Sequence, residues 1–450
     1  MKKQLTFSAH GNKDRTYRQR EFILSTFNIS GNSRGEMSRE MVALAIRKLK
    51  DLGLNQIELG HAAHDVADMA LEECEKQGIN VLWQDNTLFG GFQNQLRKMT
   101  TEDEIKKLVE DTKKLHMLSG FYVWDEPWEK QDLDATRRQT DWLDKYAPGK
   151  LGFSAMVPNY NPAYTWENMQ YPWYVGHFLD EVNPSVVSFD YYPIGEGKVK
   201  EYTEAQIDNS FLWKDMAVVR NEAVRRDWPL WFYFQAIRLG KFPDKYHFAM
   251  TRMQTSYALM YGAKCLQCYG IAGSKVCPDG LMEKRRVLEN DYQEGCFYDD
   301  MKTLLFSLKN LGKTFIALRS EHVYHGDEVL PEETYYNENL KEDFTQNKIF
   351  HLEKLPFRCS VGILSDEHFN TYIVIVNRDY EIPRTFTLPL FQIQRVYEVS
   401  KADGKHYVRD NCTDCINVTL DPGDLVLYRI QDAGEEVYDI EYVCQSEVFG

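Results

Sequence analysis

The sequence contains no apolar run of membrane-spanning length, and its first residues lack the apolar core of a signal peptide. Positively charged residues are in deficit, since the chain has 53 Lys and Arg but 68 Asp and Glu, which gives a net charge of -15. It also has no long basic cluster. Nucleic acid and membrane are therefore not expected as partners. We expect a cytoplasmic protein, with export by a signal peptide absent from this sequence as the alternative.

Cysteine is too scarce and too scattered for a disulfide framework. The nine cysteines are odd in number, so they cannot all pair within the chain, and their scatter indicates reduced thiols. Two Cys-x-x-Cys pairs occur, Cys265/Cys268 in an apolar strand-like run and Cys412/Cys415 in a turn-rich region. Neither context is typical of zinc or redox sites, so we expect no metal and no cofactor.

The chain is long and rich in aromatic residues. A chain of 450 residues suits one large domain with a smaller one. Aromatic residues make up 13% of it, with 27 Tyr, 24 Phe and 9 Trp. That surplus fits a protein that stacks flat rings on a ligand, although many of these rings belong to the core. Oligomeric state cannot be read from one chain.

Strand and helix patterns alternate regularly through the first two thirds of the chain. Eight apolar runs predict strands over residues 22–28, 56–60, 80–85, 120–125, 151–156, 186–193, 229–235 and 263–269. Helical spacing lies between them over residues 37–52, 65–77, 102–117, 132–146, 204–226 and 246–261, and again over 290–311. Eight strands in this alternation predict a (β/α)8 TIM barrel. A doubly wound sheet is the competitor, but residues 28–32 form no glycine-rich phosphate loop.

The pattern changes after about residue 315 to short strands separated by turns. Strands are predicted over residues 348–352, 359–364, 371–376, 385–390, 394–399 and 425–430. They predict a C-terminal antiparallel β-sandwich. The expected domains are thus a catalytic barrel over 1–315, the β-sandwich over 316–432, and an acidic tail over 433–450 that the pattern does not assign.

The fourth predicted strand ends in an unusual group of side chains. Asp125 and Glu126 stand between Trp124 and Trp128, and Pro127 ends the strand pairing. Carboxylates at a strand end beside flat aromatic rings are typical of sites that cleave sugars. The alternative is structural, with Asp125 capping a helix that starts near Pro127 and Glu126 interacting with the helix dipole.

Active sites of such barrels lie at the carboxyl ends of the strands, so the residues at these ends are the candidates for a site. They are mainly carboxylates, amides and aromatic rings, with few cations, which suits a neutral polyhydroxylated ligand. The candidates for substrate binding are Asn28, Glu58, His61, Asp85, Trp124, Asp125, Trp128, Tyr160, Tyr191, Gln235 and Tyr269. A weaker alternative is a lyase or isomerase that uses Glu58, Asp85 and His61 around a metal, but no third ligand follows His61 and His64 at metal-like spacing.

Three strand ends carry a resemblance to a known group of enzymes. Trp124-Asp125-Glu126-Pro127, the run from Ser188 to Pro193, and Tyr233-Phe234-Gln235-Ala236 resemble clan-A-type glycoside hydrolases. The likeness is to family-42-like β-galactosidases and their uncharacterised gut-bacterial relatives, which also carry an all-β domain after the barrel. It implies that Glu126 is the general acid/base. Asp125 departs from the asparagine that usually precedes this glutamate.

A second departure concerns the nucleophile. The resemblance implies a glutamate at the end of the seventh strand, where this sequence has Gln235, and an amide cannot form a glycosyl ester. The second catalytic carboxylate then comes from elsewhere, with Asp190 the first candidate and Glu58 the second. Alternatively, the protein is a carbohydrate-binding barrel that has lost the nucleophile.

Overall fold

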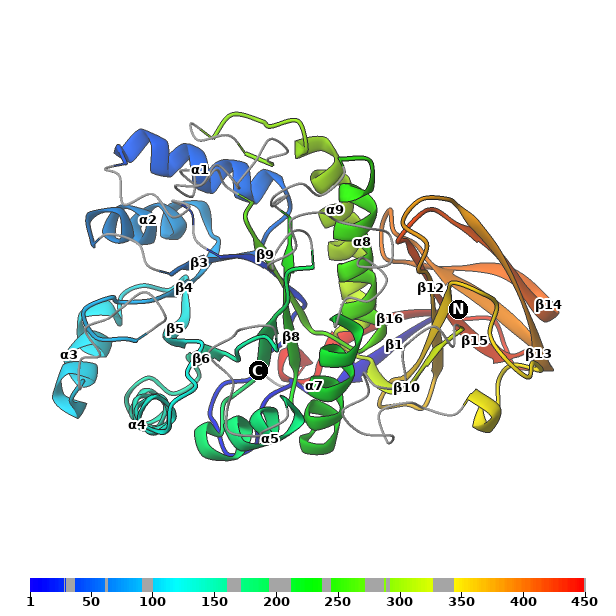
Figure 1. The fold of residues 1–450 in the computed structure, drawn as a ribbon, viewed down its shortest axis with the longest axis horizontal. Helices are drawn as coiled ribbons and strands as arrows, with labels where there is room; N and C mark the ends of the chain where they lie inside the picture. Colours follow the sequence, from blue (N-terminus) through cyan, green and yellow to red (C-terminus); the bar gives the residue numbers. More distant parts are fainter. Residues whose placement is uncertain are drawn as a thin grey trace.

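The computed structural model describes residues 1–27, 29, 37–60, 64–90, 100–159, 171–193, 212–236, 244–271, 287–288, 292–326 and 344–448. Two four-stranded parallel sheets form its first part (Figure 1). One has the order β2 (Ile23–Thr26), β9 (Cys265–Tyr269), β8 (Leu230–Gln235) and β7 (Val187–Asp190). The other has the order β3 (Gln56–Leu59), β4 (Asn80–Trp83), β5 (Leu118–Asp125) and β6 (Leu151–Ala155).

Isolated parallel bridges connect the two sheets at both of their edges. Phe27 pairs with Glu58 between β2 and β3, and Met156 pairs with Phe189 between β6 and β7. The Met156 N–H donates to the Ser188 carbonyl over 2.8 Å, which adds a hydrogen bond at the second junction. The two sheets are therefore joined at these edges, and both contribute side chains to one interior cluster, for example Ile23 and Trp231 from one sheet and Tyr122 from the other.

Helices cover the outer faces of both sheets, as Figure 1 shows. They are α1 (Arg39–Asp51), α2 (His64–Gln77), α3 (Glu102–Thr112), α4 (Lys130–Tyr146), α5 (Tyr171–Val182), α7 (Leu212–Arg226), α8 (Asp244–Met260) and α9 (Tyr298–Phe315). Thr101 and Glu104 form a capping box at the start of α3. Gly78 follows α2 with a φ of 63°, a conformation that glycine adopts without a steric penalty.

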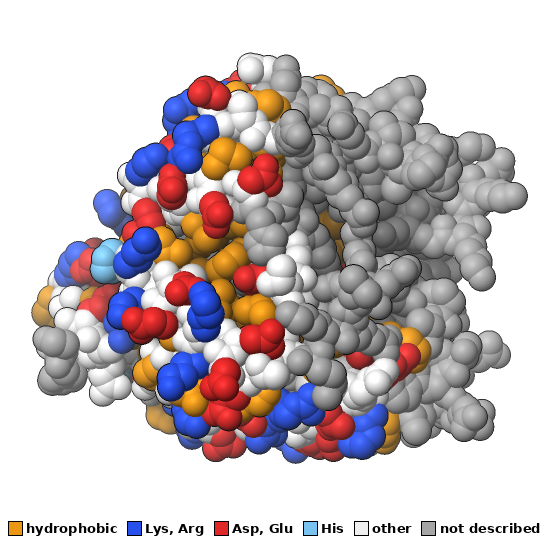
Figure 2. All heavy atoms as spheres, turned by 90° about the vertical axis from the view of Figure 1, so that its left-hand side faces the viewer, with side chains coloured by type: hydrophobic (Ala, Val, Ile, Leu, Met, Phe, Trp, Pro, Cys, Tyr) orange, Lys and Arg blue, Asp and Glu red, His pale blue; other side chains and the backbone are white. Residues whose placement is uncertain are grey.

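The outer helix surfaces carry interspersed charges of both signs (Figure 2). Lys145 on α4 pairs with Glu102 on α3 over 2.7 Å, for example, and Arg39 on α1 pairs with Glu72 on α2 over 2.5 Å. None of the helices in the described part of the chain is both long and apolar enough to span a bilayer.

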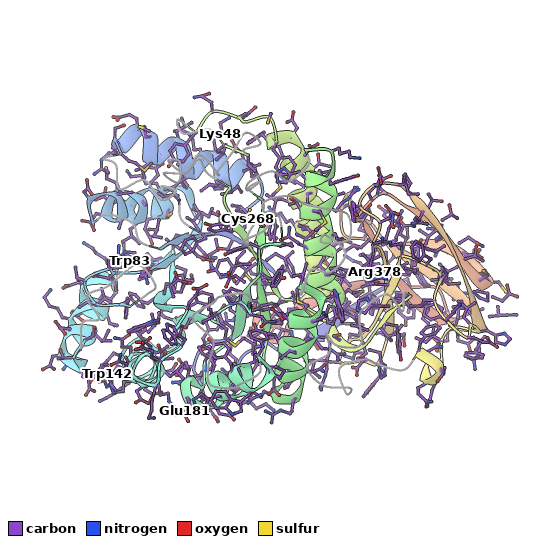
Figure 3. The ribbon with its side chains drawn as sticks, viewed as in Figure 1. Lys48, Trp83, Trp142, Glu181, Cys268 and Arg378 are labelled. Carbon is purple, nitrogen blue, oxygen red and sulfur yellow. The ribbon has the colours of Figure 1, made fainter. Side chains whose placement is uncertain are left out.

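The C-terminal part is an antiparallel sheet with a hydrophobic cluster of its own. Its strand order is β10 (Arg319–His325), β11 (Cys359–Ser365), β12 (Thr371–Asn377), β15 (Leu425–Asp432), β13 (Arg384–Val399) and β14 (His406–Leu420). α8 contacts the sheet region, since Ser256 donates to the Gly423 carbonyl over 2.9 Å. Arg378 also lies on the side of the sheet nearest α8 (Figure 3).

The first and last strands of the chain pair with each other. β1 (Lys2–Phe7) runs parallel to β16 (Asp439–Cys444), and the short α10 (Gln445–Val448) follows (Figure 1). The sequence pattern left residues 433–450 unassigned, and it included residues 2–7 in the barrel domain without predicting a strand there. Alternating burial in β1 is confined to its last residues, which explains why its period of two was not visible.

Several sequence expectations need correction in the C-terminal part. The segments 385–390 and 394–399 form one bent strand, β13, and segment 348–352 contributes only an isolated bridge between Phe350 and Leu390. β10 and β14 were not predicted. Cys412 and Cys415 lie within strand β14 and not in a turn-rich region. The other pair, Cys265 and Cys268, is buried in β9, where Cys268 lies among the central strands (Figure 3).

Candidate functional site

Alternation along the parallel strands decides which side chains point to the interior. Trp231, Tyr233 and Cys265 belong to a cluster with Ile23 and Phe153 that is separate from the core beneath the helices. Because side chains two residues apart share a face, Gln235 and Tyr269 continue this inward row at the carboxyl ends of β8 and β9. We call this end of the interior the mouth.

The same argument places Asp190 at the mouth. The Ser188 hydroxyl donates to Oε1 of Gln267 over 3.2 Å, which shows that Ser188 on β7 faces the same interior as Gln267 on β9. Asp190 lies two residues further, at the last position of β7, and is buried. The position predicted for the second carboxylate therefore points to the interior.

Glu58 lies one layer deeper and is completely buried. Its Oε1 accepts hydrogen bonds from Ser25 Oγ over 2.8 Å and from Gln267 Nε2 over 2.7 Å, and its Oε2 accepts one from the Tyr233 hydroxyl. Burial raises the pKa of Glu58 to about 7, against the opposing effect of these donors, and the charge of Asp125 adds to the increase. Glu58 is thus a carboxyl that changes protonation near neutral pH.

This shift makes folding stability depend on pH. The folded pKa exceeds the ordinary value of 4.5, so the contribution of Glu58 is complete below pH 4.5 and is lost as the pH rises to about 7. The loss is about 3 kcal/mol at 1.36 kcal/mol per pKa unit. We expect Glu58→Gln to lack it, so that urea unfolding at pH 4.5 and pH 8 shows the variant gaining about 3 kcal/mol relative to wild type. Glu110→Gln at the surface is the control, and a pH-independent difference would contradict this assignment.

A β-bulge in β5 aims Asp125 inward. Tyr122 pairs with Phe153 on β6, Asp125 pairs with Ala155, and the register shifts between Tyr122 and Trp124. The extra residue returns Asp125 to the inward row, where its Oδ1 accepts a hydrogen bond of 2.6 Å from the Tyr122 hydroxyl. Bulges of this kind commonly re-aim side chains next to active sites.

Trp124 turns away from the interior and packs on Gly90. The Gly90 N–H donates to the Val123 carbonyl over 3.2 Å, and the Gly90 carbonyl accepts from the Asp125 N–H over 3.3 Å and from Gln84 Nε2 over 2.8 Å. Trp124 is buried at 5% exposure, so it holds the end of β5 instead of offering an open wall to a sugar. This differs from the expectation that Trp124, as a neighbour of the two acids, binds substrate.

The close approach at Gly90 leads to a stability prediction. A Cβ atom at this residue would overlap the Trp124 ring, so Gly90→Ala should destabilise the fold by about 1–3 kcal/mol through overpacking. Gly176 on α5 has open space around it, and Gly176→Ala should be neutral or stabilising by up to about 1 kcal/mol. Thermal unfolding of both variants makes the comparison. Equal melting temperatures would show that the Gly90–Trp124 contact does not constrain the end of β5.

Glu126 follows β5 in a left-handed backbone conformation with a φ of 53°. Such outliers in residues other than glycine are often found at functional sites. The next residues are held by Tyr174 of α5, whose hydroxyl donates to the Pro127 carbonyl over 3.1 Å and accepts from the Val157 N–H over 3.2 Å. α4 begins only after its N-cap, Glu129. The alternative in which Asp125 caps a helix near Pro127 is therefore wrong.

The charges of Glu126 and Asp190 both affect the pKa of Tyr174. Burial raises the pKa of this tyrosine strongly, and the charges of Glu126 and Asp190 both raise it further. Both acids therefore act on one hydroxyl, although they follow different strands.

The remaining predicted residues fall into different surroundings. Gln235 is buried, and its N–H donates to Oε1 of Gln254 on α8 over 2.8 Å. Asp85 is buried and organises the loop after β4, since its Oδ1 accepts from the Thr87 N–H over 2.9 Å. Tyr191 packs in the core beneath the helices, whereas Trp128 is half-buried at the edge of that core. Asn28, His61 and Tyr160 lie outside the described residues.

Tyr192, not Tyr191, lies beside Tyr269. The rings of Tyr192 and Tyr269 stack at a centroid distance of 4.4 Å and an interplanar angle of 20°. Phe27 lies next to Tyr269, Tyr122 and Tyr233, with ring centroids 6.2 Å away in each case. The mouth therefore has an aromatic side, contributed by β2, β9 and the residues after β7.

Sequence reasoning missed the polar residues inside the strands. Ser25, Tyr122, Ser188, Tyr233 and Gln267 were counted as parts of apolar runs, although each stands two or three residues before a strand-end candidate. A polar side chain inside a buried strand is the signal that could have found them. Asp215 on α7 was missed as well. It is fully buried, accepts from Asn159 Nδ2 over 3.2 Å, and burial raises its pKa well above the ordinary value.

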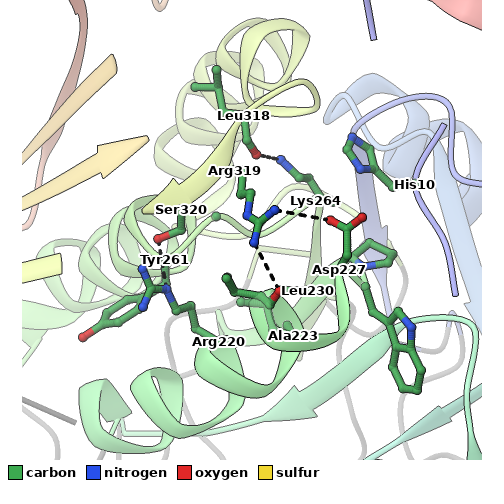
Figure 4. A pocket seen from close by; sticks show the side chains of 14 residues that line it. His10, Arg220, Ala223, Asp227, Leu230, Tyr261, Lys264, Leu318, Arg319 and Ser320 are labelled. Carbon is green, nitrogen blue, oxygen red and sulfur yellow. Dashed lines mark hydrogen bonds and ion pairs between the residues drawn. The ribbon is translucent and has the colours of Figure 1, made fainter. Parts of the chain in front are cut away.

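A cavity of about 60 Å³ lies at the opposite, amino-terminal ends of β8 and β9 (Figure 4). Its cations already have partners within the protein. Lys264 Nζ donates to the Phe315 carbonyl over 2.6 Å, Arg220 Nε donates to Ser320 Oγ over 3.2 Å, and Arg319 pairs with Asp227 over 4.0 Å. This cavity joins the strands to the α9–β10 connection and contains none of the predicted site residues.

The described residues contain no cluster of three or more His, Cys, Asp or Glu side chains suited to a metal ion. The metal-dependent alternative rested on Glu58, Asp85 and His61. Of these, Glu58 and Asp85 are already engaged in the hydrogen bonds given above, and His61 lies outside the described residues. Nothing in the described geometry therefore favours that alternative.

Comparisons with known proteins support the fold. No family model and no curated protein matches the sequence. A glycoside hydrolase family 5 structure from Bacteroides vulgatus ATCC 8482 aligns with a TM-score of 0.54 at 13% identity, over 95% of this chain and 94% of that one. Because the identity is low, this similarity shows the fold alone, which is one found among glycoside hydrolases.

Two other glycosidase structures match less closely. A family 39 glycoside hydrolase from the gut symbiont Bacteroides cellulosilyticus WH2 aligns with a TM-score of 0.49 at 10% identity, over 92% of this chain and 81% of that one. A GH2 beta-galacturonidase from Eisenbergiella tayi aligns with a TM-score of 0.45 at 14% identity, over 66% of this chain. The chain spans only about half, 54%, of the length of that protein.

Proposed function

We propose that this protein is a glycoside hydrolase acting on a neutral oligo- or polysaccharide, with Glu126 as general acid/base and Asp190 as the second carboxylate. The observation that carries the proposal is that two acids lie at the carboxyl ends of parallel strands in the two neighbouring sheets, Glu126 in a left-handed conformation after β5 and Asp190 buried at the last position of β7. The similarity to a family 5 glycoside hydrolase over nearly the whole chain is consistent with it.

The proposal includes the finer architecture. We take the two parallel sheets to close into a (β/α)8 barrel over residues 1–315, which the bridges Phe27–Glu58 and Met156–Phe189 support. We take the antiparallel strands to form a β-sandwich over 316–432. A relation to family-42-like β-galactosidases remains part of the proposal, since it rests on the three strand-end motifs.

The proposed chemistry assigns one task to each acid. Glu126 protonates the glycosidic oxygen as the bond breaks, and its left-handed backbone sets its direction apart from that of Asp125. Asp190 either attacks the anomeric carbon or activates water from the opposite face of the sugar. The spacing of the two carboxyls determines which of these occurs, and therefore whether the product retains or inverts its configuration.

Substrate recognition is proposed for the residues around these acids. The stacked Tyr192 and Tyr269 rings offer an aromatic surface of the kind on which sugars pack, and Trp128 is half-buried beside the loop that carries Glu126. Asp125, held by Tyr122, supplies acceptor oxygens for substrate hydroxyls. Gln235 has both a donor and an acceptor for the same purpose.

One observation favours a second candidate function. Gln235 occupies the position where the resemblance implies a nucleophilic glutamate, so a barrel that binds carbohydrate without cleaving it is the alternative. The wild-type protein, incubated with a panel of 4-nitrophenyl glycosides and neutral oligosaccharides, distinguishes the two. Release of free sugar supports hydrolysis. Binding by calorimetry without any turnover across the panel would support the binding-only function.

A further inference from the structure

The cavity at the amino-terminal ends of β8 and β9 is lined by more positive than negative side chains. Its cations are Arg220 from α7, Lys264 directly before β9 and Arg319 from β10. Asp227 is the single acid among the lining residues. His10 also lines the cavity, but burial and the charge of Lys264 lower its pKa to about 3, so it adds no charge near neutral pH. With Lys264 protonated, the lining therefore carries two positive charges in excess.

Lys264 retains a donor that a ligand can use. It is only 5% exposed, and its ammonium donates to the Phe315 carbonyl over 2.6 Å and to the Leu318 carbonyl (Figure 4). An ammonium has three N–H groups, and within the part of the chain that the structure describes only these two have an acceptor. Buried charges in proteins are normally paired with an opposite charge. The cavity beside Lys264 is therefore suited to a negative group.

Arg319 is held loosely at the rim of the same cavity. Its Nη1 lies 4.0 Å from Oδ1 of Asp227, and its Nη2 donates to the Val224 carbonyl over 3.5 Å. Both contacts are long for their kind, and the side chain is 54% exposed. A guanidinium presents five N–H groups in a planar fork that fits pairs of oxyanion oxygens. Arg319 can therefore bind an anion without giving up a strong contact.

The size of the cavity limits the ligand. Its volume is about 60 Å³, which is room for about four water molecules at roughly 10–15 Å³ each. A tetrahedral oxyanion is of this size, whereas a sugar ring or a nucleotide is larger. Lys264 is buried, but the side chains of Arg319 and Asp227 are more than half exposed, so an ion can enter from solvent at their end.

We propose that this cavity binds a small, doubly charged oxyanion, such as sulfate or inorganic phosphate, between the Lys264 ammonium and the Arg319 guanidinium. Its two negative charges balance the excess of the lining, to which Arg220 contributes, and its oxygens accept N–H groups of both side chains. Because these residues come from α7, β9 and β10, the bound anion connects the parallel part of the fold with the C-terminal sheet.

This site is separate from the mouth and does not rest on the proposed hydrolase function. The mouth lies at the carboxyl ends of the parallel strands, and the cavity lies at their amino-terminal ends. Anion binding is measured without a glycoside. Failure of either proposal therefore leaves the other unaffected.

The protonation of Lys264 gives the site a recognisable pH dependence. Burial lowers the pKa of Lys264 to about 7, against the opposing charge of Asp227. The other charged or titratable residues that line the cavity are Arg220, Arg319, His10 and Tyr261. Because a dianion binds the ammonium and not the neutral amine, we expect the association constant of sulfate to fall about tenfold between pH 6 and pH 8. Sulfate is the probe because it does not change protonation in this range.

A crystal structure of the full-length protein grown with selenate locates the ion. Selenate has the shape and charge of sulfate, and selenium gives an anomalous signal that water does not. We expect an anomalous peak within hydrogen-bond reach of Lys264 Nζ and the Arg319 guanidinium. Crystals without a peak in the cavity would overturn the proposal.

Urea unfolding in increasing sodium sulfate, at an ionic strength kept constant with sodium chloride, tests binding in solution. Sulfate at 100 times its dissociation constant should lower the unfolding equilibrium constant of the wild-type protein about 100-fold. We expect Lys264→Met and Arg319→Gln each to weaken sulfate binding about tenfold or more. Arg225→Gln removes a cation from the outer surface of α7, where its side chain is 62% exposed, and should bind sulfate like the wild-type protein.

Two variants are used so that Arg319→Gln, at the exposed rim, still tests the site if Lys264→Met fails to fold. Sulfate excluded from protein surfaces stabilises folded proteins in general, and this effect does not saturate. Equal stabilisation of the wild-type protein and all variants would therefore overturn the proposal. A selenium peak without saturable stabilisation would show an adventitious ion only, and it would overturn the proposal as well.

Discussion

Glu126→Gln is expected to reduce kcat/KM about 10²- to 10⁴-fold on glycosides with an alkyl or sugar leaving group. The amide keeps the size and much of the hydrogen bonding of the carboxyl but cannot give up a proton to the departing oxygen. A 2,4-dinitrophenyl leaving group needs no such proton, so bond cleavage in that substrate should be affected much less. The dependence of the loss on the leaving group is therefore the signature of an acid catalyst.

The matched control lies three residues further along the chain. Glu129 is the N-cap of α4, makes no side-chain cap bond, and accepts instead from Gln131 Nε2 over 2.6 Å. Glu129→Gln changes a carboxyl to an amide in the same loop and should keep near wild-type activity. An equal loss on both leaving-group classes would indicate a structural effect of Glu126→Gln, and an unchanged rate would remove Glu126 from the mechanism.

Asp190→Asn is expected to lower kcat at least about 10²-fold on every leaving group, because both the attack on the anomeric carbon and the activation of water need a carboxylate. A steady-state assay measures this loss. A second variant with a smaller side chain, Asp190→Ala, is assayed in the presence of azide or formate. A small anion can enter the space left by the carboxyl and restore turnover. The configuration of the resulting glycosyl azide would then show which face Asp190 occupies.

Asp215 is a buried carboxyl that was not among the sequence candidates and is a further test of this role. It is buried at the start of α7 and bonded to Asn159, which follows β6. If Asp190 is the second carboxylate, Asp215→Asn should retain activity, even if its unfolding midpoint changes. Loss of activity in Asp215→Asn with Asp190→Asn still active would reassign the second catalytic position to α7.

The parallel part of the fold could be predicted from the sequence because its apolar strand runs and its helical spacing are both clear. Runs such as 229–235 are apolar on both faces, since they lie between the interior and the helices, and glycines such as Gly53, Gly78 and Gly262 mark the helix ends. The C-terminal sheet was harder to predict. Strand β14 has exposed residues over most of its length, so it has no alternation to detect.

The site could be predicted only as a set of strand ends. Sequence placed Asp125, Glu126, Asp190 and Gln235 at the mouth, but the direction of Trp124 depends on a bulge whose register is set by β6. The contacts of Glu58 were beyond prediction for a different reason. Tyr233 and Gln267 are distant from Glu58 in sequence and contact it only in the folded chain.

The most direct test of the central claim is a crystal structure of the Glu126→Gln variant with an intact oligosaccharide that the wild-type protein cleaves. We predict the scissile glycosidic oxygen within hydrogen-bond reach of the side chain at position 126, about 2.6–3.2 Å, and the Asp190 carboxylate on the opposite face of the sugar ring. A sugar bound at the mouth with no glycosidic oxygen near position 126, or with Asp190 out of reach of its anomeric carbon, would contradict the mechanism.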